Sequence, residues 1–433
     1  MRTIGIAILT LGIFAVAVAV QNAPKPMVDD AKKAPADASP KYVKGNLHTH
    51  SLWSDGDDFP EMIADWYKSH GYQFLAMTEH NTLAEGDRWI AADGKEPRPQ
   101  AVAKYRDRFG DRWVERKAAK EKPLVRLKPQ SEYRTLFDEP GKFLIVPAEE
   151  ITHKYAKAPV HINAINVRDV FKPIDGGSVE ETISVNMRQV ADRRAKTGQK
   201  VLAILNHPNF GWGVRAEEMI LAEGLRFFEV FNGHPGVRNY GDADHVSCEM
   251  MWDIVNTLRI GKHDLPIVYG MATDDAHYYH SYGVGKVNPG RGWVMVKTSH
   301  LTSETIVNAL EAGDFYSTSG VLLEDIAKVE SEYRLTIKQE PGITYSTEFI
   351  ATMKSASIES IARKDKDGNE LPVTRLYSEQ IGKVVARSTE SKPAYKFTGQ
   401  ELYVRAKVTS SKPHPNPYAA GDREVAWTQP VRP

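Results

Sequence analysis

From Tyr42 onward, short apolar runs alternate with stretches of helical periodicity, and this alternation constrains the fold more than any other feature of the sequence. The helical stretches cover residues 60–70, 179–196 and 245–258. Strands that alternate with helices indicate parallel strands joined by crossover helices. The sequence therefore predicts either an α/β barrel or a doubly wound sheet. The apolar runs span residues 43–47, 74–77, 143–146, 160–167, 201–205, 227–231 and 267–270.

Two further segments flank or interrupt this pattern. A polar and basic insertion, residues 83–140, separates the second run from the third, and we expect residues 102–122 within it to be helical. Barrel enzymes often place elements that shape the substrate site at such a connection, although a surface decoration fits equally well. Beyond residue 326 the apolar period becomes two, between turns rich in Pro and Gly. We expect an α/β domain over residues 42–325 and a small β-sandwich over residues 326–433.

The N-terminal segment has the pattern of an export signal. A single Arg2 precedes an uninterrupted apolar run that ends at Val20, which predicts a signal peptide over residues 1–20. An uncleaved anchor is the alternative, because the run is long for a signal and short for a spanning helix. Residues 21–41 are rich in Pro, Ala, Asp and Lys and predict a flexible linker. We expect a periplasmic or secreted protein whose membrane contact is limited to such an anchor.

Charge and cysteine content exclude several classes of function. Lys and Arg total 56, as do Asp and Glu, so the formal net charge is zero and gives no sign of a nucleic-acid partner. Cys248 is the one cysteine, which excludes an intrachain disulfide and a thiolate metal cage. We expect a small-molecule substrate, and the sequence identifies no protein partner.

Imidazole and carboxylate groups stand at the ends of successive apolar runs. Because residues two apart on a strand share a face, His48 and His50 can bind one ion, and Asp275 has the same spacing to His277. Nitrogen and oxygen ligands without a thiolate suit Zn, Mn or Fe. The sequence therefore predicts a metal centre, in which a shared carboxylate could bridge two ions. The candidate groups are His48, His50, Asp55, His80, Glu149 or Glu150, His161, His207, Asp274 or Asp275, and His277.

The motifs around these residues resemble the PHP (polymerase and histidinol phosphatase) superfamily of metal-dependent phosphoesterases. The resemblance covers about residues 42–320 and implies a distorted (β/α)7 barrel. It rests on HTHSLWSDG at 48–56, TEHNT at 78–82, AEEIT at 148–152, His161, NHP at 206–208 and DDAH at 274–277.

The resemblance also implies how the ligands divide among three ions. His48, His50, Glu150 and Asp275 would hold the first ion. Glu150 would bridge to a second ion, which His161 and His207 complete. Asp55, His80 and His277 would hold a third. One position departs from the family, because Glu79 stands where Asp is usual, which puts any proton-shuttle role of that residue in doubt.

Several residues are weaker candidates for contact with the substrate. Arg291 could clamp an anion or only flank a turn, and His234, with Asn232, could reach the substrate or shape a turn. Trp53 could form an apolar wall of the substrate site or only pack in the core. Tyr316 and Ser319 lie in a segment that resembles one of the family, where they could contact the substrate or have a structural role.

The expected activity is hydrolysis of small phosphate mono- or diesters by a metal-bridging hydroxide held by Glu150. A second resemblance, to the PHP-like CehA/McbA metallohydrolases, implies a carbamate or carboxyl ester as the alternative substrate. A third possibility is a non-catalytic binding module stabilised by metal. Nine open ligands argue against it, because structural zinc sites are usually closed four-coordinate cages.

Overall fold

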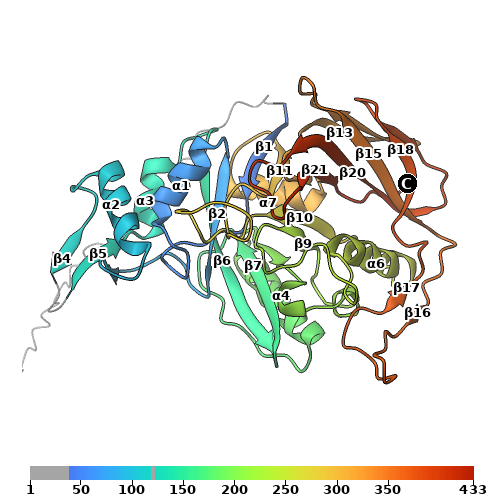
Figure 1. Ribbon diagram of the computed structural model, residues 1–433, viewed down its shortest axis with the longest axis horizontal. Helices are drawn as coiled ribbons and strands as arrows, with labels where there is room; N and C mark the ends of the chain where they lie inside the picture. The colour runs from blue at the N-terminus through green and yellow to red at the C-terminus, as the bar shows by residue number, and fades with distance from the viewer. Residues whose placement is uncertain (1–38, 119–121) are drawn as a thin grey trace, which may run out of the picture. The chain divides into compact units, whose positions relative to one another are not determined.

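The computed structural model describes residues 39–118 and 122–433 (Figure 1). The expected signal peptide and residues 21–38 of the expected linker lie outside the described residues. Ser39–Pro433 forms one compact unit. No helix within residues 39–118 and 122–433 has the length and apolar character needed to cross a membrane.

All seven predicted runs form strands, which lie in the order β10-β9-β8-β7-β6-β2-β1. Neighbouring strands pair in parallel, except that β7 runs antiparallel to both β6 and β8. The expectation of parallel strands is therefore confirmed for six strands and wrong for β7. A hairpin, in which Ala156 has a φ of 52°, joins β7 directly to β6 and leaves no room for a crossover helix. The bounds are β1 (Lys41–Asn46), β2 (Phe74–His80), β6 (Leu144–Tyr155), β7 (Ala158–Ile165), β8 (Leu202–Leu205), β9 (Phe227–Asn232) and β10 (Tyr269–Thr273).

The two outer strands of this series, β1 and β10, meet at their carboxyl ends. Thr49 and Ala276 form an isolated parallel bridge. The His50 amide donates to the Ala276 carbonyl at 3.0 Å, and the Asp275 amide donates to the His48 carbonyl at 3.0 Å. The segments that follow β1 and β10 therefore lie side by side, which brings the first and last motifs together.

Helices cover the outer faces of these strands. The predicted helical stretches correspond to α1 (Pro60–Ser69), α4 (Val179–Thr197) and α6 (Cys248–Gly261). The Ser178 side chain caps α4 by accepting from the Glu181 amide. The Ser247 side chain caps α6 in the same way, so this helix begins later than the predicted residue 245. The shorter elements are η1 (Phe210–Trp212), α5 (Ala216–Ile220) and α7 (Ser303–Ala312).

The insertion forms a small layer of its own over α1. A sheet of order β3-β5-β4 packs with α2 and α3 around Tyr105 and Tyr133, which are completely buried. The helix expected over residues 102–122 ends at Phe109, because Gly110 leaves the helical region with a φ of 76°. The bounds are β3 (Arg88–Ala91), α2 (Arg98–Phe109), β4 (Arg116–Ala118), β5 (Pro123–Leu127) and α3 (Gln130–Phe137).

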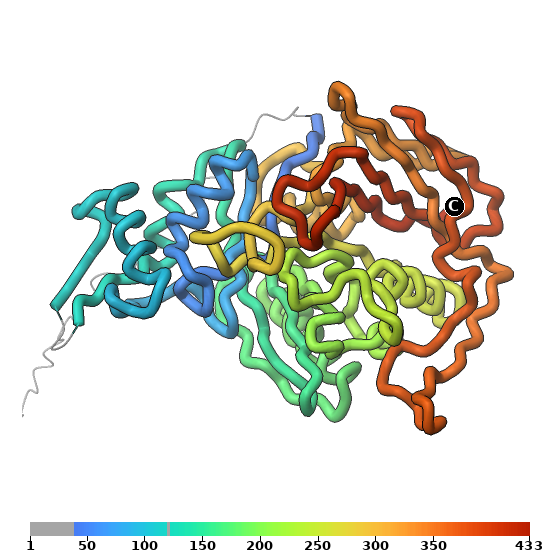
Figure 2. Tube along the Cα trace, viewed as in Figure 1, coloured from blue at the N-terminus to red at the C-terminus, as the bar shows by residue number. Residues whose placement is uncertain are grey.

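The C-terminal strands continue the central sheet on the far side of β1. The sheet extends in the order β1-β11-β12-β21-β20-β15-β18, and its C-terminal strands appear in orange and red in Figure 2. A separate sandwich domain stays a prediction, but the β12–β21 pairing joins its strands to the sheet that carries the motifs. The result is a mixed α/β chain with a large central sheet, whose motif-bearing strands are mainly parallel, as predicted.

The remaining C-terminal strands form two small sheets, of orders β13-β14-β19 and β16-β17. The bounds of all strands that follow β10 are β11 (Trp293–Thr298), β12 (Phe315–Thr318), β13 (Leu323–Val329), β14 (Glu332–Ile337), β15 (Tyr345–Met353), β16 (Ser360–Ile361), β17 (Leu376–Tyr377), β18 (Lys383–Ser388), β19 (Ala394–Lys396), β20 (Glu401–Pro413) and β21 (Arg423–Thr428).

Candidate metal centre

One face of the central strands changes from apolar to polar along its length. Side chains two apart on a strand share that face. On β2 the series runs from Phe74 and Ala76, in an apolar cluster beneath the site, to His80. On β6 it runs from Val146 and Ala148 to Glu150, and on β9 from Phe227 to Glu229. Because β7 is antiparallel, its apolar Ile165 comes last and its His161 comes first. The hydrophobic cluster thereby supports the polar groups from below.

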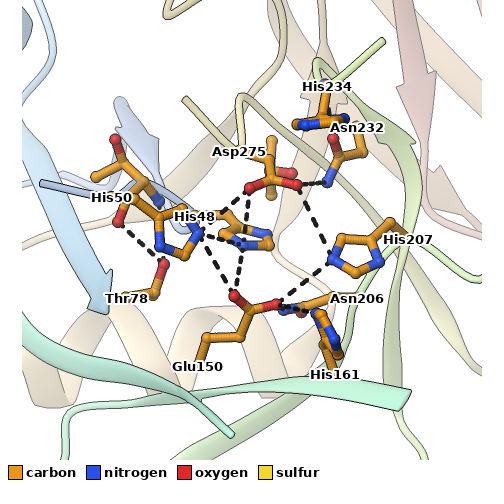
Figure 3. Close-up of polar contacts among 12 residues, drawn as sticks. His48, His50, Thr78, Glu150, His161, Asn206, His207, Asn232, His234 and Asp275 are labelled. Carbon is orange, nitrogen blue, oxygen red and sulfur yellow. Dashed lines mark hydrogen bonds and ion pairs between the residues drawn. The ribbon is translucent and has the colours of Figure 1, made fainter. Parts of the chain in front are cut away.

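In Figure 3 the His48 and His50 nitrogens lie between the carboxylates of Asp275 and Glu150. His48 Nε2 lies 3.1 Å from His50 Nε2, and Asp275 Oδ1 lies 3.2 and 3.3 Å from these two nitrogens. Glu150 Oε2 lies 3.5 Å from His48 Nε2 and 3.4 Å from His50 Nε2. Ligands about 2.0–2.1 Å from a tetrahedral zinc ion are separated by about 3.3–3.4 Å. The spacing of the His48, His50 and Asp275 atoms therefore fits three ligands of one ion, and Glu150 groups with His48 and His207.

Glu150 presents its two oxygens to different groups. Oε2 is buried and accepts no hydrogen bond of normal geometry, although His80 Nδ1 lies 2.8 Å away. Oε1 lies 3.0 Å from His161 Nδ1 and 3.4 Å from His207 Nε2. A completely buried carboxylate in this position suits a bridge between two cations.

A third group lies at the more exposed edge of the centre. Asp55 Oδ1 lies 3.3 Å from His277 Nε2, and Asp55 Oδ2 lies 3.4 Å from His80 Nε2. The Asp55 side chain is 55% exposed, whereas His50, which stacks on both histidines, is buried. All nine ligands expected from the sequence therefore converge here, and three overlapping subsets can each hold an ion.

Backbone strain marks two of the candidate ligands. His207 has a φ of 23° and Asp275 a φ of 49°, which L residues rarely adopt. Strain of this kind persists only where the surrounding contacts fix it, and it is concentrated at functional sites. Here the amide of His207 donates to Glu229 at 2.8 Å, and that of Asp275 donates to the His48 carbonyl.

The charges of the centre depend strongly on one another. Burial raises the pKa of Glu150 and of Asp275, but the positive potential of His48 and the neighbouring histidines outweighs it and holds both pKa values well below their usual range. Burial and the adjacent His277 lower the pKa of His50 to about 3. His50 therefore stays neutral, and a neutral imidazole keeps the lone pair that a metal ligand needs.

The sequence analysis missed Glu229, the acidic residue of the apolar strand FFEVFN. Its Oε1 lies 2.6 Å from His48 Nδ1 and accepts from the Thr273 hydroxyl at 2.7 Å. Its Oε2 accepts from Asn232 Nδ2 at 2.8 Å, and Asn232 also donates to Asp275 Oδ2 at 3.1 Å. A carboxylate on the outer nitrogen of a ligand histidine fixes the ring for metal binding. The signal for Glu229 was a single charge inside an otherwise apolar strand.

Arg291 and His234, two of the weaker candidates for substrate contact, have different surroundings. Arg291 is completely buried and donates to the carbonyls of Gly233, Lys286 and Gly283, so it organises loops and does not fit the expected role of an anion clamp. His234 lies beside the centre, with its ring centroid 5.8 Å from that of His277.

The other residues singled out from the sequence support the fold around the centre. Glu79 accepts from the hydroxyls of Ser51 and Ser54 and so holds the loop that carries Asp55. Trp53 packs in the core beneath the insertion, and the Tyr316 hydroxyl accepts from the Leu323 amide. Ser319 and Cys248 are also buried, and neither makes a hydrogen bond to any of the nine ligands among the described residues.

Comparison with known proteins gives distant structural neighbours. No protein-family model and no curated protein matches the chain. The chain is similar to a two-domain protein containing a predicted PHP-like metal-dependent phosphoesterase from Bacteroides vulgatus, with 14% identity, a TM-score of 0.37 and coverage of 90% of this chain and 96% of that chain.

Two further solved structures are similar over a shorter part of the chain. A putative metal-dependent phosphoesterase from Bifidobacterium adolescentis has 15% identity and a TM-score of 0.28, and the match covers 58% of this chain and 91% of that one. An amidohydrolase from Chromobacterium violaceum has 15% identity and a TM-score of 0.25, with coverage of 55% and 88%. PHP-like phosphoesterases are thus among the structural neighbours, as the motifs predict. At TM-scores below 0.5 these likenesses carry no argument about activity, which has to rest on the contacts described above.

Proposed function

We propose that the protein is a metal-dependent hydrolase of small phosphate mono- or diesters. The observation that carries the proposal is the set of three overlapping groups of His, Asp and Glu side chains, with the completely buried Glu150 carboxylate among them. Two or three divalent ions, Zn, Mn or Fe, would be held by the three groups of the centre. When bound, they would lower the pKa of a coordinated water and neutralise charge on the phosphoryl oxygens.

The chain's own residues supply orientation and hydrogen bonds. Glu229 holds His48 so that Nε2 faces the other ligands. The Gly236 amide donates to His234 Nδ1 at 2.9 Å, which leaves the proton of the neutral ring on Nε2. Burial lowers the pKa of His234, so this ring remains neutral and can donate a hydrogen bond to an oxygen of the ester.

The wider interpretation of the chain belongs to the same proposal. We propose that the seven strands β1, β2 and β6–β10 form a distorted (β/α)7 barrel, followed by a β-sandwich domain. The parallel bridge between Thr49 and Ala276 supports closure of the barrel. We also propose a periplasmic or secreted location, which rests on the apolar run that ends at Val20.

Substrate class is tested with a panel of p-nitrophenyl phosphate, bis-p-nitrophenyl phosphate and an aryl carbamate, assayed with one metal at a time. We expect turnover of a phosphate ester, and its loss in His50→Ala and Asp275→Ala with the circular dichroism spectrum unchanged. Turnover of the carbamate alone would replace the phosphoesterase assignment with a carbamate hydrolase. Wild-type activity in both variants would refute the centre itself.

A further inference from the structure

A second cavity, of about 340 Å³, lies away from the metal centre, between α6 and the C-terminal strands β15, β20 and β21. Figure 1 shows α6 next to β20, with which it is in contact. The cavity falls within the range of about 300–1,000 Å³ that is typical of small-molecule sites. None of the nine candidate metal ligands lines it.

The wall of this cavity contains a buried donor without a hydrogen bond. Arg405 is only 2% exposed, and its Nη1 makes no hydrogen bond within the described residues, with Glu249 Oε2 3.7 Å away. Leaving a buried donor unpaired costs about 1–3 kcal/mol. A ligand that brings hydrogen-bond acceptors to this wall would remove that cost.

The charges around the cavity are already balanced. Arg405 binds Asp253 through two hydrogen bonds of 2.8 and 2.6 Å, and Lys407 binds Glu249 at 2.6 Å. Both pairs line the cavity, so it has no net charge to attract an ion. Gly382 keeps the space beside Asp253 open, because a Cβ there would lie 2.5 Å from Asp253 Oδ2. The cavity therefore suits a neutral ligand.

The same walls combine acceptors, donors and apolar surface. Glu249 offers carboxylate oxygens close to the free Nη1 of Arg405, and Phe231 and Ile350 contribute apolar surface. Tyr240, which is 54% exposed to solvent, also lines the cavity and contributes an aromatic ring. A hydroxyl group both donates and accepts, so it satisfies a carboxylate and a guanidinium together, and the C–H face of a sugar ring packs on an aromatic side chain.

We propose that this cavity is a binding site for a neutral hexopyranose, separate from the metal centre and independent of its activity. A hollow of about 50 Å³ shares Phe231, Tyr240, Glu249, Lys407 and Trp427 with the cavity, so the cleft continues beyond a single ring. The C-terminal strands would thus attach the enzyme to a glycan through residues contributed jointly by α6, β20 and β21.

Isothermal titration calorimetry with methyl β-D-glucopyranoside, methyl β-D-galactopyranoside and methyl α-D-mannopyranoside tests the site on the full chain. We expect at least one glycoside to bind with a stoichiometry of one. Tyr240→Ala and Glu249→Gln should each weaken that binding about tenfold. Tyr155→Ala, which removes an exposed tyrosine at the β6–β7 hairpin outside the cavity, is the matched control and should bind as the wild type does.

The outcomes separate this proposal from the proposed function. Binding that persists in Asp275→Asn would place the sugar outside the metal centre, whatever that variant does to ester hydrolysis. Absence of binding by all three glycosides, or equal binding by wild type and both cavity variants, would overturn the proposal. Binding of benzoate in place of the sugars would also overturn it, because the site would then select an anion.

Discussion

Glu229 Oε1 lies 2.6 Å from His48 Nδ1, and both side chains are completely buried. The opposite nitrogen of the same ring lies 3.2 Å from Asp275 Oδ1. When the ring is neutral, Glu229 accepts the proton on Nδ1, and Nε2 then has a lone pair directed at the other ligands. Glu229 thus determines which nitrogen of His48 is available to a metal.

We predict that Glu229→Gln weakens metal binding about 10- to 100-fold, because the amide lacks the charge that makes His48 a stronger ligand. Competition with a chromophoric chelator measures the affinity. Glu61→Gln is the matched control, since Glu61 is an equally buried carboxylate bonded to Tyr105 and Trp113 and not to the centre. Equal affinities in the two variants would contradict the role of Glu229.

Asp274 and Asp275 are adjacent in sequence, and we predict that substitution of one affects stability whereas substitution of the other affects turnover. Asp275→Asn should abolish turnover, with little change in the stability of the metal-free protein, because Asn tolerates the positive φ of this position. Asp274 accepts from the amides of Gly290, Arg291 and Gly292, so Asp274→Asn should destabilise the fold by about 1–3 kcal/mol. Urea denaturation and ester turnover separate the two. Loss of stability in Asp275→Asn equal to that in Asp274→Asn would contradict this division.

The clustering of the candidate metal ligands could be predicted from the sequence because their signal is local. A pair such as His48 and His50 at the end of an apolar run carries its own geometry, since alternate residues of a strand share a face. Glu229 carried no comparable signal, because its partner His48 lies 181 positions away in the chain.

The surroundings of a residue were harder to predict than its chemistry. Arg291 has the right chemistry for an anion, but carbonyls from separate loops surround its guanidinium, and no sequence pattern shows this convergence. The direction of β7 was missed for a related reason, since an apolar run does not reveal whether a hairpin or a helix precedes it.

Removal of metal should lower stability, because ions that bind only the folded state stabilise it by mass action. For protein stripped with EDTA, we predict that Zn or Mn at about 100 times its Kd raises the free energy of unfolding by about 2.7 kcal/mol. Thermal unfolding across a metal titration measures the effect. Asp275→Asn should give a much flatter titration, and a wild-type midpoint that does not respond to any of Zn, Mn or Fe would contradict the centre.

Glu61 should make the stability of the fold depend on pH. Burial raises the pKa of Glu61 to about 7, from 4.5 in the unfolded chain, and its Oε2 has no hydrogen-bond partner among the described residues. A carboxyl whose pKa is higher in the folded state binds its proton more tightly there. Its contribution to stability is therefore complete below the unfolded pKa and is lost as the pH rises through about 7.

Glu61→Gln removes this titration, so its stability relative to the wild type should increase between about pH 5 and about pH 8.5, by about 2.5 kcal/mol in the free energy of unfolding. Urea denaturation of both proteins at the two pH values measures the difference, and the comparison cancels the titration of every other group that the substitution leaves undisturbed. A difference between variant and wild type that stays constant with pH would show that Glu61 is charged in the folded protein throughout this range.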